Sequence, residues 1–216
     1  GKAILKTTEL GYDGKGQIRV SGGNMDAATL WADLKTDEAI LEGFVDFKAE
    51  VSFLVWRDSE GQMGVFPPAQ NIHKAGILAK SVAPAPDISA RVIEAGNRAV
   101  HAIAEAVDLH GILAMEAFVG TDDRLIFNEI APRPHNSFHW TIEGCTTSQS
   151  RQLVRIITGL GAGDTAVKGQ YVMENLLGED LHRLDGLYAD GRNAVHLYGK
   201  GEARNCRKMG HVTYQK

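Results

Sequence analysis

The sequence predicts an α+β fold in which antiparallel sheets are flanked by helices. Short apolar runs bounded by glycine, proline or aspartate recur along the chain, which is typical of strands. A long stretch from Asp87 to Leu109 instead places its apolar residues at helical spacing and reads as one core helix capped by Asp87 or Ser89. Two further strands are joined by the turn at 120–123, which makes them antiparallel neighbours.

The N-terminal part is predicted to contain two strands, a loop and a short helix. Lys2 to Thr7 reads as a strand, and Thr8 to Gln17 is a loop rich in glycine. Its glycines allow backbone N–H groups to cradle an anion, although the spacing of a P-loop is absent and an ordinary hairpin is the alternative. Tyr12 and Asp13 at its tip could close over a substrate. A helix is expected from Asp26 to Leu34, and a strand over 39–45.

The middle of the chain is predicted to be a set of strands. Asp46 to Arg57 alternates in part between apolar and polar residues and reads as a strand with one wet face that carries Glu50. Gln62 to Phe66 would return through a hairpin, and 70–83 would form two short strands. His73 lies in the first of these, where a lone histidine is more often structural than functional.

Glu116 and Glu129 are predicted to face each other on neighbouring strands. Glu116 lies in an apolar run from Gly111 to Val119, and Glu129 lies in the return strand after the turn. Two facing carboxylates in apolar surroundings repel unless a cation lies between them, so the pair predicts a divalent metal site. The alternative is that one carboxylate points inward and the other outward.

A polar loop follows the second of these strands, from Asn128 to Trp140. Two prolines keep it from continuing the sheet. Five hydrogen-bonding side chains are concentrated in it: Arg133, His135, Asn136, Ser137 and His139. Carboxylate and amide oxygens beside an arginine suit Mg²⁺ and phosphate groups. A plain surface loop with a structural arginine–glutamate pair is the alternative.

The C-terminal part is predicted to be one helix followed by short strands. Thr147 or Ser148 would cap a helix to Gly159. Strands are expected over 170–177, 194–198 and 204–213. A basic cluster occupies the last part of the chain, and on its own it reads as a solvated face. Its members are Lys200, Arg204, Arg207, Lys208 and His211.

The composition excludes several classes of protein. The 216 residues are 44% hydrophobic and carry a formal net charge of −4, which gives no basic field for a nucleic acid. No apolar run approaches the roughly 18 residues of a membrane span. The two cysteines have no metal-ligand spacing, so a reduced cytoplasmic protein is expected. Because the sequence opens directly in a strand, we expect it to be a piece of a longer protein.

Together these motifs resemble the N5-carboxyaminoimidazole ribonucleotide synthases, the ATPase subunits of phosphoribosylaminoimidazole carboxylase, which are ATP-grasp ligases. The resemblance covers essentially the whole chain. It rests on Ala3 to Thr7, Gly11 to Gln17, Glu42 to Val45 with Glu50, Asn128 to Ser137, His139 to Thr141, and Arg207 to His211. It implies an ATP-grasp fold with a lid part at 1–45, a core part at 46–162 and a small, mostly β part at 163–216. The family's N-terminal domain is expected to be absent.

The resemblance also implies the role of each site residue. It implies that ATP binds to Lys6, Gly11, Tyr12, Asp13, Gly14, Lys15, Gly16, Gln17, Glu42, Gly43, Phe44, Val45, Glu50, His73, Asn128 and Glu129. It implies that Mg²⁺ binds to Glu116, Glu129 and Asn128. It implies that the ribonucleotide contacts Tyr12, Asp13, Arg133, His135, Asn136, Ser137, Lys200, Arg207 and Lys208. Asp13, Arg133 and Lys200 would be the catalytic residues.

The implied reaction has two steps. Bicarbonate attacks the γ-phosphate of ATP to give carboxyphosphate, and the amine of 5-aminoimidazole ribonucleotide then takes up the carboxyl group, or CO₂ released from it. The family implies a homodimer that works with a mutase, without nucleic acid or membrane. Another ATP-grasp carboxylate–amine ligase and an inactive nucleotide-binding fragment are the alternatives. The sequence departs from the family at Phe138, where the family usually has glycine. Phenylalanine adopts a positive φ only at a cost, so either the loop is altered here or the position tolerates a side chain.

Overall fold

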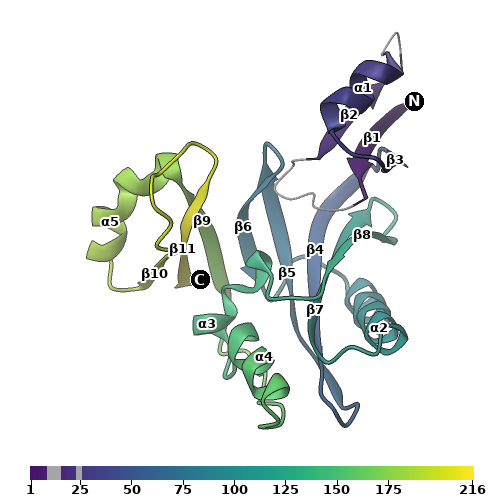
Figure 1. Ribbon diagram of the computed structural model, residues 1–216. Helices are drawn as coiled ribbons and strands as arrows, with labels where there is room; N and C mark the ends of the chain where they lie inside the picture. The colour runs from purple at the N-terminus through teal and green to yellow at the C-terminus, as the bar shows by residue number, and fades with distance from the viewer. Residues whose placement is uncertain (9–15, 23–25) are drawn as a thin grey trace. The chain divides into compact units, whose positions relative to one another are not determined.

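The computed structural model describes residues 1–8, 16–22 and 26–216, and its chain forms two compact units (Figure 1). The first unit comprises residues 1–46 and 74–77, and the second comprises 47–73 and 78–216. No helix within the described ranges is long and apolar enough to cross a bilayer. The three-part division at 45 and 162 stays a prediction.

The first unit is built on a three-stranded antiparallel sheet. Strand β1 (Lys2–Thr7) lies between β2 (Gln17–Ser21) and β3 (Ala39–Gly43). Helix α1 (Ala27–Leu34) begins after Asp26, whose carboxylate accepts hydrogen bonds from the backbone N–H groups of two first-turn residues. An N-terminal carboxylate satisfies donors that the first turn leaves free, so the predicted start of this helix is confirmed.

The second unit is built on an eight-stranded sheet with the order β10-β11-β9-β6-β5-β4-β7-β8. Its strands are β4 (Phe47–Arg57), β5 (Met63–Lys74), β6 (Ile77–Ala83), β7 (Gly111–Gly120), β8 (Leu125–Ala131), β9 (Tyr171–Leu177), β10 (Asn193–Leu197) and β11 (Lys208–Gln215). Strand β4 pairs antiparallel with β5 and β7, and β7 pairs antiparallel with β8. The predicted α+β class with antiparallel sheets is therefore confirmed.

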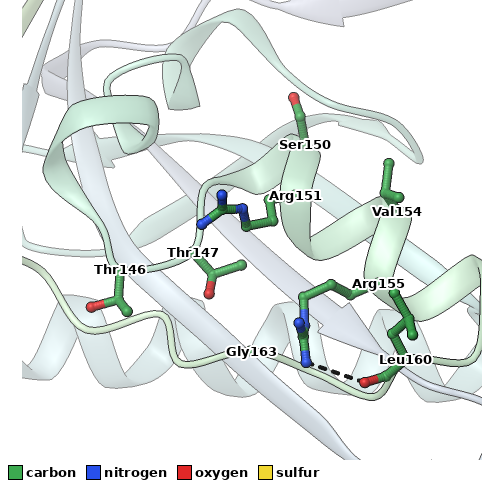
Figure 2. Close-up of a pocket in the computed structure, with 8 residues that line it drawn as sticks. All are labelled: Thr146, Thr147, Ser150, Arg151, Val154, Arg155, Leu160 and Gly163. Atoms are coloured by element: carbon green, nitrogen blue, oxygen red, sulfur yellow. Dashed lines mark hydrogen bonds between the residues drawn. The ribbon is translucent and has the colours of Figure 1, made fainter.

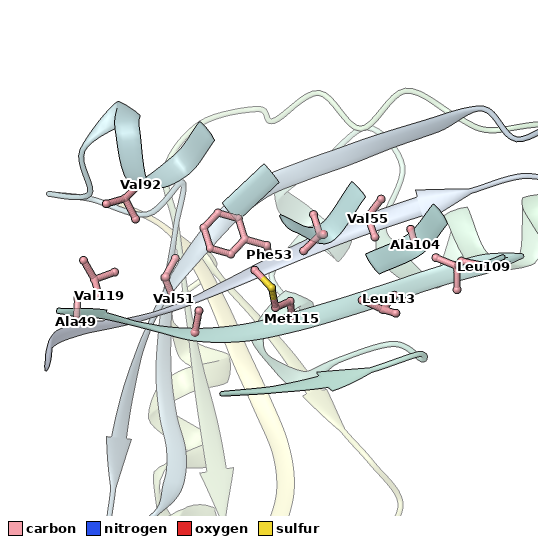
Figure 3. Close-up of a cluster of buried hydrophobic side chains, with 12 residues drawn as sticks. Ala49, Val51, Phe53, Val55, Val92, Ala104, Leu109, Leu113, Met115 and Val119 are labelled. Carbon is pink, nitrogen blue, oxygen red and sulfur yellow. The ribbon is translucent and has the colours of Figure 1, made fainter. Parts of the chain in front are cut away.

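The prediction of one wet face on β4 is wrong. Val51, Phe53 and Val55 pack in the cluster shown in Figure 3, which helix α2 (Ala90–Ala106) covers. The opposite face is also buried, because Leu54 packs in a second cluster and Ser52 is fully buried. A strand at the centre of a sheet with elements over both faces has no exposed side, and local alternation could not reveal the second cover.

Strand β5 is one long strand, although two separate pieces were predicted here. The predicted strand at 62–66 and the first strand of 70–83 join across residues 67 and 68, which are both prolines. The pairing with β4 slips by one residue between Ser52–Ala69 and Leu54–Phe66. This bulge accommodates residues that have no N–H group to donate, so the strand continues past the prolines.

Helix α2 ends at Ala106, three residues before the predicted end. Asp108 follows with a left-handed φ of 47°, which stops the helix. Helix α4 (Gln149–Ile157) begins after Ser148 as predicted, and Ser148 accepts a hydrogen bond from the N–H of Arg151. Four short helical segments were not predicted: η1 (Asn136–Phe138), α3 (Thr141–Gly144), η2 (Gly178–Arg183) and α5 (Leu184–Ala189). Each is too short to show a periodic apolar pattern.

Phe138 lies in η1, and it is not among the residues with positive φ. Its side chain is fully buried between Phe66 and Trp140, with 6.5 Å between its ring centroid and each of theirs. The backbone conformation therefore does not require glycine here. The phenylalanine instead fixes the polar loop to the core of the second unit.

Candidate active site

Glu116 and Glu129 are direct partners on β7 and β8, as the sequence predicted. The register shifts at this point, because Ala117 pairs with Phe127 while Glu116 pairs with Glu129. Asn128 is therefore the extra residue of a β-bulge. Without the bulge Glu116 would pair with Asn128, so the bulge brings the two carboxylates opposite each other.

The two carboxylates form a cluster with His135 from the polar loop. Ligand atoms of the three residues lie within 4.8 Å of one another. Burial and the charge of Glu129 raise the pKa of Glu116 to about 7. A carboxylate that holds a proton near neutral pH indicates a place where negative charge is not balanced by the protein itself. An oxygen-binding cation such as Mg²⁺ would supply that balance.

A row of buried polar side chains supports Glu116 from across the sheet. The hydroxyl of Ser52 on β4 lies 3.4 Å from a Glu116 oxygen. The amide of Asn71 on β5 donates to Ser52 at 2.6 Å, and Ser81 on β6 donates to Asn71 at 2.9 Å. The sequence analysis missed Asn71 and Ser81. Their partners are distant in sequence, and only the sheet order brings them together.

Glu50 and His73 form a second pair beside this cluster. The Nδ1 atom of His73 lies 2.5 Å from a Glu50 oxygen across β4 and β5. Burial opposes protonation of His73, but the contact with Glu50 outweighs burial and raises the pKa of His73. The charges of Glu50 and His73 also act on Glu116. The structure thus brings together four residues that the sequence analysis assigned to nucleotide or metal: Glu50, His73, Glu116 and Glu129.

The polar loop after β8 is held in place by side chains from other elements. Asn136 and Asn175 of β9 exchange two amide hydrogen bonds of 2.9 and 2.7 Å. Ser137 is fully buried, and its hydroxyl lies 2.8 Å from Nδ1 of His135. Arg133 is exposed and donates to the carbonyl of Pro134. Arg133 is thus available to a ligand, whereas the largely buried ring of His135 is held by Ser137.

The basic C-terminal residues lie around the β10–β11 connection. Lys200 is exposed and lies 5.4 Å from the ring centroid of Tyr198. Arg207 is exposed and donates to the carbonyl of Glu202. Lys208 begins β11. Burial is the main cause that lowers the pKa of His135 and of His139, and the charge of Lys208 adds to it in both. A lysine that acts on His135 lies close enough to the cluster to attract an anionic ligand there.

The remaining predicted residues are in the first unit. Lys6 on β1 forms an ion pair of 2.5 Å with Glu42 on β3. Gly43 ends β3, and the N–H of Phe44 donates to the carbonyl of Lys2. Gly16 precedes β2 and Gln17 begins it, and Val45 follows β3. The predicted residues Gly11, Tyr12, Asp13, Gly14 and Lys15 lie outside the described residues.

The pocket drawn in Figure 2 is separate from these residues. It lies along α4 and is lined by Thr146, Thr147, Ser150, Arg151, Val154, Arg155, Leu160 and Gly163. Arg155 in this pocket donates to the carbonyl groups of Leu160 and Gly161, so it provides hydrogen bonds to the backbone that follows the helix. None of these lining residues was predicted to bind a ligand.

Two family models match the chain. The ATP-grasp domain matches residues 1–150, and the phosphoribosylaminoimidazole carboxylase C-terminal domain matches residues 172–216. The first match covers more than half of the sequence. The chain therefore belongs to the ATP-grasp family, and the predicted ATP-grasp fold is confirmed.

Within that family the chain is similar to N5-carboxyaminoimidazole ribonucleotide synthases, as its motifs indicated. It is 45% identical to the synthase of Brucella melitensis over 99% of this chain and 59% of the relative. A synthetase structure from Staphylococcus aureus complexed with ADP has a TM-score of 0.89 at 34% identity, over 100% of this chain and 57% of that one. A synthase structure from Aspergillus clavatus in complex with ADP and 5-aminoimidazole ribonucleotide also has a TM-score of 0.89, at 27% identity, over 99% of this chain and 57% of that one. The chain thus spans less than two thirds of the length of these relatives.

Three histidines form a cluster next to the polar loop: His196 on β10, His211 on β11, and His139, which precedes α3. The ring of His211 stacks on His196 at 4.6 Å and lies 5.0 Å from His139. Tyr198 contacts Nδ1 of His211 at 2.9 Å, and Glu143 contacts Nε2 of His196 at 2.8 Å. Burial and the neighbouring histidines lower the pKa of His211 to about 3, while burial, Lys208 and His196 lower that of His139 to about 4.

The lowered pKa values of these histidines predict that the protein loses stability in mild acid. Below pH 6.5 the unfolded chain binds protons that His135, His139 and His211 do not bind in the folded state, which lowers stability from pH 6.5 toward pH 4. Glu116, whose pKa is raised to about 7, has the opposite effect in this range, but three histidines outweigh one carboxyl group. The expected slope is about 1.4 kcal/mol per pH unit for each histidine. Urea denaturation between pH 7 and 5 measures it. His211→Gln should flatten the slope and the exposed His110→Gln should not; an unchanged slope in His211→Gln would contradict the prediction.

Proposed function

We propose that the chain carries out the ATP-dependent carboxylation of 5-aminoimidazole ribonucleotide with bicarbonate. In this reaction the bicarbonate oxygen attacks the γ-phosphorus of ATP and ADP leaves, which gives carboxyphosphate. The exocyclic amine of the ribonucleotide then attacks the carboxyl carbon, phosphate leaves, and the amine releases one proton. The observation that carries the proposal is the facing pair Glu116 and Glu129 beside His135 in a chain of the ATP-grasp family.

Mg²⁺ is the metal that this site fits. Glu116, Glu129 and Asn128 offer oxygen atoms, and the raised pKa of Glu116 indicates a deficit of positive charge. The ion, when bound, would stabilise the negative charge of the transferring phosphoryl group. The pair of Glu50 and His73 in the same unit supports a role of these two residues in binding ATP. Lys6, Glu42 and the following residues to Val45, in the first unit, are assigned to ATP on the resemblance alone. The relatives that were solved with ADP support the same assignment.

The anionic ribonucleotide is proposed to bind to the cationic and amide groups of the second unit. Arg133 and Lys200 are exposed cations, and Lys208 lies close enough to change the pKa of His135. His135 and Asn136 add neutral hydrogen-bonding groups, because burial lowers the pKa of His135 to about 4. The complex of the Aspergillus clavatus synthase with 5-aminoimidazole ribonucleotide supports this choice of substrate. Arg133 and Lys200 would stabilise the transition state, and Asp13 would orient the amine.

The remaining assignments concern the location, the assembly and the partner of the whole enzyme. The whole enzyme would act in the cytoplasm as a homodimer, and a mutase would consume its product. Gly11 to Gln17, with Tyr12 and Asp13, would cover the phosphates. These assignments are proposed on the resemblance alone.

The test is the release of ADP by this chain with ATP, Mg²⁺ and bicarbonate, with and without 5-aminoimidazole ribonucleotide. We expect the ribonucleotide to stimulate ADP release. Stimulation by another amine, such as glycinamide ribonucleotide, and none by the expected substrate would overturn the assignment. Binding of ATP without any turnover would instead identify a nucleotide-binding chain that does not catalyse the reaction by itself.

A further inference from the structure

Gln149 connects helix α4 to the polar loop through a side chain that is fully buried. Its Oε1 atom accepts a hydrogen bond of 2.9 Å from the backbone N–H of His135. Its Nε2 atom donates to the backbone carbonyl of His135 at 2.9 Å and contacts Nδ1 of His139 at 2.9 Å. One amide therefore holds both ends of the segment from His135 to His139.

The orientation of this amide is fixed by its backbone partners. A backbone N–H only donates and a backbone carbonyl only accepts, so the Gln149 oxygen faces the first and its nitrogen faces the second. The second hydrogen on Nε2 is then directed to Nδ1 of His139, which accepts. His139 consequently carries its proton on Nε2. Both N–H groups of the Gln149 amide therefore have an acceptor.

The backbone of Gln149 adds a further connection to the same loop. Its N–H, which the first turn of a helix leaves without a partner, donates to the hydroxyl of Thr141 at 3.0 Å. That hydroxyl donates to the carbonyl of Phe138 at 2.6 Å. Loop and helix therefore form one connected polar network in the interior, in which a missing partner leaves the other groups unsatisfied.

We propose that Gln149 is a positioning residue for the ribonucleotide site. By binding the backbone of His135 on one side of η1 and the ring of His139 on the other, it holds His135 and Asn136 in the geometry in which they face the substrate. It does not touch the substrate and acts only through the loop. This inference rests on the proposed function, since the ribonucleotide is the ligand that the loop is proposed to bind.

Two substitutions test it. Gln149→Met keeps the volume of the side chain and removes all three of its hydrogen bonds. Gln149→Glu keeps the acceptor for the N–H of His135 but places an oxygen against the carbonyl of His135 and against Nδ1 of His139. Outer partners of metal ligands typically act at the 10–100-fold level. By analogy we expect the affinity for 5-aminoimidazole ribonucleotide to fall roughly tenfold or more in both variants. The affinity for ATP should be unchanged.

Gln152 provides the matched control on the same helix. Its side chain is also fully buried, its Oε1 atom accepts from the N–H of Gly163, and its Nε2 atom has no hydrogen-bond partner in the described structure. Gln152→Met removes one hydrogen bond where Gln149→Met removes three, so it should cost less stability and cause no loss of ribonucleotide affinity. Equal losses of affinity in the two methionine variants would overturn the inference, because they would reflect a general effect of unfolding.

A spectroscopic measurement separates this inference from the proposed function. The ¹⁵N shifts of His139 report which ring nitrogen carries the proton, whether or not the chain binds ribonucleotide. We expect the Nε2–H form in the unsubstituted chain and a protonated Nδ1 in Gln149→Glu. No ribonucleotide binding by the unsubstituted chain would overturn the proposed function. Unchanged His139 shifts in Gln149→Glu, or unchanged ribonucleotide affinity in both variants, would overturn the role of Gln149.

Discussion

Replacement of Glu129 by glutamine is expected to reduce ribonucleotide-stimulated ADP release by at least about 100-fold, because it removes one of the two charges that would hold the metal. The same change should leave the metal-free protein as stable as before or more stable. The charge of Glu129 is one of the causes that raise the pKa of Glu116 to about 7, so its removal relieves repulsion. Activity and stability therefore change in different directions, which a misfolded variant could not reproduce.

ADP release and urea denaturation without metal are the two measurements for Glu129→Gln. Glu116→Gln should show the same loss of activity, and the double variant should be little worse than either single one, because the two carboxylates act on one ion. The exposed Glu105→Gln on α2 serves as the control and should retain full activity. Wild-type ADP release by Glu129→Gln would show that the carboxylate pair is not the metal site.

The position of this pair could be predicted from the sequence because it depends on local geometry. A turn of known length between two strands fixes which residues face each other, and the turn at 120–123 brought Glu116 opposite Glu129. The bulge at Asn128 was not predicted, since a bulge leaves no regular pattern in an apolar run. The match was correct because the prediction counted back roughly from the turn and did not assume strict register.

The groups that support Glu116 and His135 could not be predicted, because their contacts depend on tertiary packing and not on local geometry. Asn71 and Ser81 reach Glu116 only through the order of the strands, and Gln149 reaches His135 only because α4 packs beside the loop. The sequence shows each of them as an ordinary polar residue in a strand or helix. Their burial is what identifies them, since a buried amide needs hydrogen-bond partners and those partners belong to the site.

Replacement of Phe138 by glycine is expected to lower the free energy of unfolding by about 3–5 kcal/mol, even though glycine is the usual residue in the resembled family. The phenylalanine is fully buried against Phe66 and Trp140 and belongs to the second core cluster. Its removal leaves a cavity that the surrounding side chains fill only in part. The backbone offers no compensation, because Phe138 lies in a short helix without positive φ.

Urea denaturation at neutral pH measures this loss. Phe138→Ala separates the effect of the cavity from the effect of losing the Cβ atom. The alanine variant creates nearly the same cavity but keeps a Cβ atom, so it should be more stable than the glycine variant by up to about 1 kcal/mol. Phe127→Ala is the control, because Phe127 is 57% exposed on β8 and its removal should change stability by less than about 1 kcal/mol. If Phe138→Gly also lowered the free energy of unfolding by less than about 1 kcal/mol, the loop would have closed over the cavity. In that case Gln149 and Asn175, and not the aromatic anchor, would determine the position of the loop.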